Sequence, residues 1–447
     1  MNKRLLFASA LFAAALLCAC GEKEQSWKKD VPKTTVDKIV AGRVGDVLPG
    51  WEEGWLDIHS INTGRGECFF YIFADGTTML IDAGGARNCE TYTYANGASP
   101  GVPSKPSQFV SSASVISNYI RHYMPSVSNG KLDYMMVSHY HGDHFGTGGD
   151  EFPIHSEGGF RMNSVTSVGC DFPAVKILDR GDFNDPPSSD WFDGTTNYDN
   201  YIKFVNWSVK KYGTVHEKIR VGATDQIVPK HDPSACQYFQ VRNLAAGGYV
   251  WTGTGTESST ALPSTAELMA YGKGSGNQVG ENVMSVALLF SQGSFDWFTG
   301  GDGQHNGYST YPYKDIETPI AKAVNKRVDA MKADHHCTNN TNSEGMVSIY
   351  KPEVVIAGVW RDVQPNPATV QRFINYNPNV HIFATNLTTA NREVLEQYGI
   401  NMGRFESTGG HVVIRVHPTG LRYWIFVLDD TDQEYRISKR VGPFTSN

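Results

Sequence analysis

Four side chains that commonly bind metals fall within six positions of this sequence: His139, His141, Asp143 and His144. They follow an apolar stretch, residues 132–137, so we expect them on a loop at the carboxyl end of a buried strand. Imidazole and carboxylate groups bind Zn²⁺, Fe²⁺ or Mn²⁺ while leaving a position open for water. The first two histidines alternate along the chain and face one way, whereas Gly142 allows the backbone to turn. The run therefore predicts two cations, at the spacing of about 3.5–4 Å found in hydrolytic two-metal sites.

This H-x-H-x-D-H run resembles the signature of the metallo-β-lactamase fold. Three other segments resemble the remaining motifs of that family and occur in the family order: residues 77–85, 295–302 and 331–336. The resemblance implies an α/β fold, a four-layer αβ/βα sandwich with two divalent cations. Zinc is the first expectation and manganese the alternative. The implied ligands are His139, His141, Asp143, His144, Asp302 and His336, with Asp302 bridging both cations and Asp82 supporting the loop without binding metal.

The double histidine poses a choice. If the preceding strand continues, His335 and His336 point to opposite faces, and only one of them can reach the metal. We expect His336 to be the ligand, and His335 to support a ligand or to contact the leaving oxygen. Asp143 would orient the second metal and the attacking water. Asp143 and His335 are thus the expected catalytic residues.

Two further segments narrow the resemblance to one branch of the family. Residues 61–68 and 282–288 resemble the V-G-Q-G-D hairpin and the N-x-x-S-L-V strand of a branch that includes the nuclease-like domain of competence DNA-channel proteins. Phosphorylcholine esterases of teichoic acids are similar in their ligand set. The resemblance implies hydrolysis of a phosphodiester or related ester by metal-activated water. The alternatives are a β-lactam or lactone hydrolase and a non-catalytic binding lipoprotein.

The sequence departs from this branch at two places. Cys337 and Thr338 stand where the branch has Gly-Ser, and Asn282 stands about where a third histidine of the first metal is expected. Three histidines of the middle segment could supply that ligand instead: His155, His216 and His231. His411 follows two glycines at the start of a predicted strand and could also lie near the site.

The first 20 residues predict export. Lys3 and Arg4 precede an apolar stretch, residues 5–17, that is too short to span a bilayer as an anchor. Residues 17–20 (Leu-Cys-Ala-Cys) resemble a bacterial lipobox, which implies that a lipid on Cys20 attaches the protein to a membrane surface of the cell envelope (the outer membrane, if Gram-negative). An ordinary secretory signal is the alternative.

The net charge of the chain indicates which classes of binding partner it favours. The formal net charge is −7, which does not favour nucleic acid, because cationic patches supply most of the affinity for phosphate backbones. A small-molecule or envelope-polymer ester is the expected substrate.

We expect a signal peptide at residues 1–19, a flexible stalk at 20–50, one domain at 51–432 and a tail at 433–447. The stretch 150–280 is rich in Gly, Ser, Thr and Asn and predicts an insertion that covers the site. Strands are expected at 55–61, 68–73, 78–81, 132–137, 284–290, 296–299, 328–331, 354–359, 411–416 and 423–428, and helices at 114–124 and 316–328. Cys337 is the cysteine we expect to be free.

Overall fold

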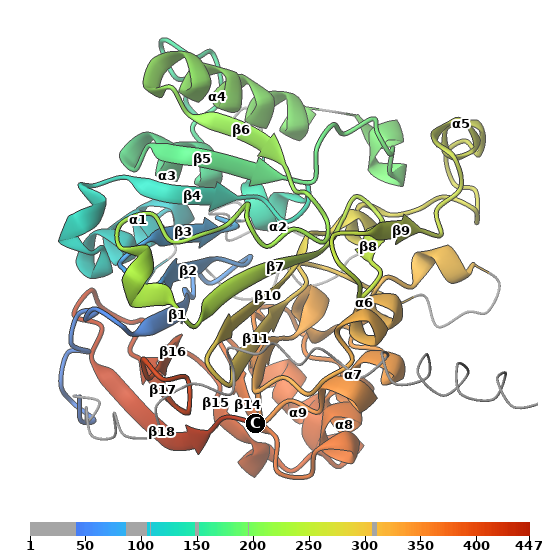
Figure 1. Ribbon diagram of the computed structural model, residues 1–447. Coiled ribbons are helices and arrows are strands. Elements are labelled where there is room, and N and C mark those ends of the chain that lie inside the picture. Colours follow the sequence, from blue (N-terminus) through green and yellow to red (C-terminus); the bar gives the residue numbers. More distant parts are fainter. Residues whose placement is uncertain (1–41, 86–104, 108, 148–151, 195, 306–310) are drawn as a thin grey trace, which may run out of the picture.

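The computed structural model describes residues 42–85, 105–107, 109–147, 152–194, 196–305 and 311–447. Its backbone forms two nine-stranded mixed sheets (Figure 1). In spatial order the first sheet contains β18 (Ile437–Thr445), β17 (Arg422–Leu428), β16 (His411–Val416), β1 (Leu56–Ser60), β2 (Phe69–Ile72), β3 (Thr78–Ile81), β4 (Leu132–Met136), β5 (Ala174–Asp179) and β6 (Val215–Lys218). The second contains β15 (Phe405–Ser407), β14 (His381–Ala384), β13 (Val354–Ala357), β12 (Ala330–Lys332), β11 (Phe295–Thr299), β10 (Ala287–Gln292), β7 (Phe239–Ala246), β8 (Tyr249–Trp251) and β9 (Ser258–Thr260).

Three apolar cores define four layers. One core lies between the sheets and takes side chains from both, such as Ile58 of β1 and Phe290 of β10. A second joins the outer face of the first sheet to α1 (Ser112–Tyr123), α3 (Ser164–Asp171) and α4 (Thr196–Tyr212). The third joins the second sheet to α6 (Glu317–Val324), α7 (Glu344–Tyr350), α8 (Pro367–Tyr376) and α9 (Thr389–Tyr398). The expected αβ/βα sandwich is confirmed.

Local sequence explains why these elements form. In α1, Val115, Ile116, Tyr119 and Ile120 recur at helical spacing and are all buried. Ser111 caps the helix by accepting a hydrogen bond from the backbone of the first turn. β4 is buried along its whole length, as expected for a strand covered on both faces.

The parallel strands of each sheet place their carboxyl ends at one edge. β3 to β6 are parallel in the first sheet, and β11 to β15 in the second. The loop after β4 carries the H-x-H-x-D-H run and a short helix, α2 (Gly142–Phe145). The loop after β11 carries Asp302, and the turn after β12 carries the double histidine. Ligands separated by almost 200 positions therefore reach one edge of the sandwich because of strand direction alone.

Three expectations about the chain's organisation were wrong. The stretch 150–280 is not an insertion that only covers the site, because β5 and β6 extend the first sheet while β7, β8 and β9 extend the second. The expected tail contains β18, which pairs with β17. Part of the expected stalk contacts the first sheet, since Val47 forms an antiparallel bridge with Arg436 and Leu48 is buried. Some of these pairings, such as β7 with β10, join segments that are far apart in the sequence, and a local pattern does not reveal them.

The remaining strand and helix predictions agree with the structure to within a few residues, and β14, β15, α7, α8 and α9 are additions. The short α5 (Thr265–Ala270) lies in the Gly-rich stretch. Among the described residues, no helix is long and apolar enough to cross a membrane. The described cysteines, Cys68, Cys170, Cys236 and Cys337, are all free. The signal peptide, Cys20 and residues 20–41 lie outside the described residues.

Candidate metal centre

Asp82, at the end of β3, supports the metal-binding loop from behind. Its Oδ1 accepts a hydrogen bond from the Ser138 backbone N–H at 2.7 Å, and its Oδ2 lies 2.8 Å from Nδ1 of His144. Because Nδ1 of His144 is occupied in this way, Nε2 is left to face the site. The contacts match the expectation that this aspartate orients the loop.

Three groups of ligand-type side chains lie together, and the first consists of His139, His141 and Asp302. The third, Glu67 with His144 and Asp302, shares Asp302 with the first and His144 with the second. Nε2 of His139 lies 3.0 Å from Nδ1 of His141 and 3.7 Å from Oδ2 of Asp302. Both imidazoles therefore direct a nitrogen toward one point beside the carboxylate. This geometry suits a cation held by two nitrogens and one oxygen.

The second group consists of Asp143, His144 and His336, and it shares Asp302 with the first. Nε2 of His144 lies 3.1 Å from Oδ1 of Asp302. Nε2 of His336 lies 3.4 Å from Oδ2 of Asp302 and 3.3 Å from Oδ2 of Asp143. Asp302 thus contacts both groups, as a bridging carboxylate must.

The donor atoms fit cations by a second criterion. Nε2 of His144, Nε2 of His336 and Oδ1 of Asp302 are buried and have no hydrogen-bond partner. Buried polar atoms in proteins are normally paired, so unpaired atoms that converge require an explanation. Divalent cations bound at these atoms would supply the missing partners.

The electrostatics of the group point the same way. Burial opposes the charge of Asp302, but His144 and His336 outweigh it and hold the pKa of this carboxyl well below its usual range. Burial likewise opposes charge on these two histidines. Asp302 outweighs it together with Asp82 at His144 and with Glu67 and Asp143 at His336, so that the pKa of each lies well above its usual range. The pocket is therefore strongly anionic unless protons or cations neutralise it.

The double histidine does not lie on a strand, so the expected alternation of faces was wrong. β12 ends at Lys332, and residues 334–337 form a tight turn, η7 (Asp334–Cys337). His335 and His336 have left-handed φ angles of 46° and 56°. Both then face Asp302, with Nε2 of His335 3.7 Å from Oδ2. His336 belongs to a ligand group, whereas His335 lies beside it and is 28% exposed.

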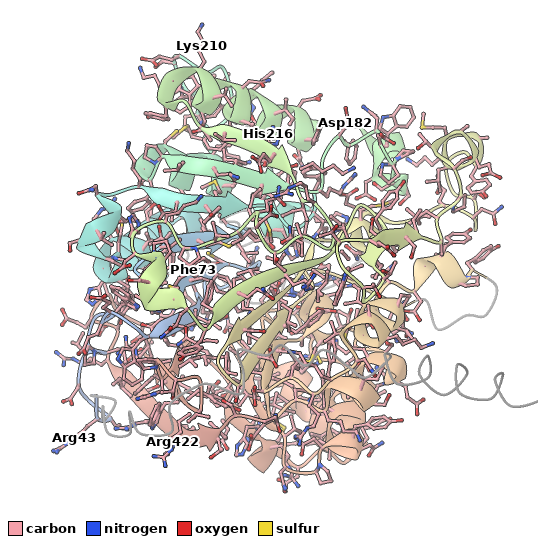
Figure 2. All side chains as sticks on the ribbon, in the orientation of Figure 1. Arg43, Phe73, Asp182, Lys210, His216 and Arg422 are labelled. Carbon is pink, nitrogen blue, oxygen red and sulfur yellow. The ribbon has the colours of Figure 1, made fainter. Side chains whose placement is uncertain are left out.

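None of the histidines considered as the third ligand belongs to either group. His155 stacks on Phe160, and Nε2 of His216 lies 2.7 Å from Asp179 on the β5–β6 side of the molecule (Figure 2). His231 contacts Asp133. His411 accepts a hydrogen bond from the Asn62 backbone within an aromatic cluster under α1.

Asn282 lies beside the site, as the sequence predicted. Its Nδ2 is 3.3 Å from Nδ1 of His335 and 3.4 Å from Oε1 of Gln304. Its Oδ1 is buried without a hydrogen-bond partner. An unpaired amide oxygen beside His335 is consistent with a harder, weaker donor in the place of a third imidazole.

Sequence reasoning missed the groups that hold the histidines from behind. Nδ1 of His336 lies 3.0 Å from Oε1 of Glu67, whose other oxygen lies 2.8 Å from Nζ of the buried Lys332. Nε2 of His141 lies 2.7 Å from Oδ2 of Asp190. Glu67 could have been found from its place in the glycine hairpin, 61–68, whereas nothing in the sequence marks Asp190.

Close packing of the glycine hairpin brings Glu67 to the site. The Glu67 backbone N–H donates to the Asp143 carbonyl at 2.9 Å, and the Gly84 N–H donates to the Glu67 carbonyl at 2.8 Å. A Cβ on Gly84 would lie 1.8 Å from the Asp143 carbonyl oxygen, so only glycine fits there.

No family model matches the sequence, and no curated protein matches it. A solved isothiocyanate hydrolase from Delia radicum gut bacteria is similar at 13% identity and a TM-score of 0.36, covering 79% of this chain and 98% of that chain. Igni18, a metallo hydrolase from the archaeon Ignicoccus hospitalis, is similar at 8% identity and a TM-score of 0.32, covering 80% and 98%.

Proposed function

We propose that this chain is a metal-dependent hydrolase that uses two divalent cations to cleave a phosphodiester or related ester. The observation that carries the proposal is the convergence of two ligand groups on the two oxygens of Asp302. The motif resemblance of residues 61–68 and 282–288 supports the choice of ester. Zinc fits the imidazole-rich donor set, and manganese fits an amide oxygen from Asn282.

Cations bound in this site would lower the pKa of water and stabilise negative charge that develops on the substrate. The protein's own groups would place the substrate. The side chains of His141, Asp143 and His335 are each about one-third exposed, whereas those of His139, His144 and His336 are almost fully buried. The exposed three therefore mark the open side of the site. On this open side His335 would donate an N–H to the leaving oxygen, and Asp143 would hold the attacking water.

Export and lipid attachment through Cys20 are part of the proposal. They are supported by the basic start, the apolar stretch and the Leu-Cys-Ala-Cys run. On this basis the substrate would be a small molecule or an envelope polymer met outside the cytoplasm.

The test uses protein lacking residues 1–20, loaded with zinc or manganese, and chromogenic phosphodiester, β-lactam and lactone substrates. We expect about two cations per chain and turnover of the phosphodiester. Asp143→Ala should lower turnover by more than the roughly 10–100-fold that follows loss of a group behind a ligand. His216→Ala is the control, because this histidine contacts Asp179 and belongs to neither ligand group. A protein that binds no cation refutes the metal centre, and turnover of only β-lactam or lactone refutes the choice of ester.

A further inference from the structure

His141 uses both of its ring nitrogens. Its Nδ1 lies beside Nε2 of His139 in the first ligand group, and its Nε2 lies 2.7 Å from Oδ2 of Asp190. A neutral imidazole that donates its Nε2–H to a carboxylate must carry its lone pair on Nδ1. The contact with Asp190 therefore selects the tautomer that can bind a cation in the first group.

Asp190 is itself held in place. It lies in a short 3-10 turn, η3 (Ser189–Asp193), whose Ser189 N–H donates to the Val279 carbonyl at 2.7 Å. The Ser189 hydroxyl donates to Oδ1 of Asp190 at 3.2 Å, which leaves Oδ2 for His141. Both anchors come from the stretch 150–280, so this stretch supports the metal loop from outside the ligand motifs.

The first ligand group depends on this support more than the second does. In the second group, Asp82 lies behind His144 and Glu67 behind His336. In the first, His139 has only the Ser138 hydroxyl, at 3.1 Å from its Nδ1. The first group also has fewer ligand-type side chains, three against the four of the second group when Asp302 is counted in both. Among the described residues, Asp190 is thus the one carboxylate that contacts the ring nitrogen of a first-group histidine opposite its metal-facing nitrogen. It contacts Nε2 of His141 and thereby strengthens Nδ1 as a donor.

We infer that Asp190 is a positioning residue for the first cation: it fixes His141 with Nδ1 toward the metal and increases the donor strength of that nitrogen. This inference rests on the proposed function, because it requires that cations bind. Removing the carboxylate should not unfold the loop. The Asp190 side chain is 35% exposed, and the Tyr140 backbone N–H between the two histidines is held independently by Glu281, at 3.2 Å.

The experiment compares Asp190→Ala and Asp190→Asn with the unchanged protein. Cation affinities are measured by competition with a chromogenic chelator, and the Co²⁺-loaded protein is examined by its visible absorption spectrum. We expect Asp190→Ala to weaken the first, looser cation about 10–100-fold, to alter the Co²⁺ spectrum, and to leave the second affinity and the melting temperature of the metal-free protein unchanged. Asp190→Asn keeps an acceptor oxygen without the charge, so its loss should be smaller.

Asp185→Asn is the matched control, because this carboxylate of the same loop accepts from the Thr265 hydroxyl instead. The inference is overturned if Asp190→Ala binds both cations with unchanged affinity and an unchanged Co²⁺ spectrum, or if it weakens both sites equally. Either result would leave the proposed hydrolase standing. If the unchanged protein binds no cation, the proposed function falls, and the inference falls with it.

Discussion

The buried ion pair between Arg180 and Glu281 should be the most sensitive electrostatic contact near the site. Nε and Nη2 of Arg180 lie 2.6 and 2.8 Å from the two oxygens of Glu281. Both side chains are fully buried, and the guanidinium stacks 4.9 Å from the ring centre of Tyr140. The pair joins the loop after β5 in one sheet to η5 (Glu281–Met284), the turn before β10 in the other.

The expected magnitude follows from burial. Removing one partner of a buried pair leaves an uncompensated charge and costs about 3–5 kcal/mol. Glu281→Gln also weakens the acceptor for the Tyr140 N–H, which adds about 1 kcal/mol. We therefore expect Glu281→Gln to lower the free energy of unfolding by about 4–6 kcal/mol. The double variant Arg180→Met with Glu281→Gln should recover much of the loss, because no buried charge remains.

Urea denaturation of the metal-free protein, read by tryptophan fluorescence, gives the midpoints and slopes. Glu157→Gln is the control, because Glu157 forms a fully exposed ion pair with Lys211 and its loss should not be measurable. A cost below about 1 kcal/mol for Glu281→Gln, or a double variant as unstable as the sum of the two single variants, would refute the reasoning.

Three further predictions concern pH, metal removal and export. Burial lowers the pKa of His411 to about 3, so the folded protein does not bind a proton that the unfolded chain binds below about pH 6.5. The free energy of unfolding should therefore fall as the pH drops from 6.5 toward 3. His411→Asn should reduce this pH dependence in melting curves measured across the same range. Chelator titration should remove the cation at His139 and His141 before the other, because this group has three ligand-type side chains and the other has four. Manganese should restore activity at least as well as zinc. Equal affinities with a strict zinc requirement would contradict this prediction. Cys20→Ser should abolish lipidation and release the protein from membranes, which mass spectrometry and membrane fractionation would measure. An unchanged mass and an unchanged membrane fraction would show that residues 17–20 are not a lipobox.

The sequence predicted the parts of the site that are encoded locally. The H-x-H-x-D-H run holds four ligand-type residues in one loop, and Asp302 and His336 each follow a short apolar strand. Such segments can be recognised from the sequence, because an apolar strand followed by small and polar residues ends at the edge of a sheet. The supporting residues could not be read in this way. Asp190 is 49 positions from its partner His141, and only the pairing of β5 with β4 brings its loop to the site.

The same reason explains the errors in chain organisation. β6 has the sequence Val-His-Glu-Lys and is largely exposed, because it is the edge strand of the first sheet. It shows neither the alternation nor the apolar run by which strands are recognised. β18 is likewise an edge strand with only its first residue and one near its end buried. Edge strands form by pairing with a neighbour, and the neighbour is not visible in the local sequence.

The turn that presents the double histidine shows how far the site departs from local preference. His335, His336 and Cys337 are three consecutive residues with φ of 46°, 56° and 59°, and none is glycine. Left-handed backbone costs about 1–2 kcal/mol for each such residue. The turn persists because its surroundings hold it: the Asp334 N–H donates to Asn342, the Thr338 N–H donates to the His335 carbonyl, and Nζ of Lys332 donates to the Gly301 carbonyl. Strain of this kind concentrates at functional sites. Here it brings two successive imidazoles to one face of Asp302, which an extended strand cannot do.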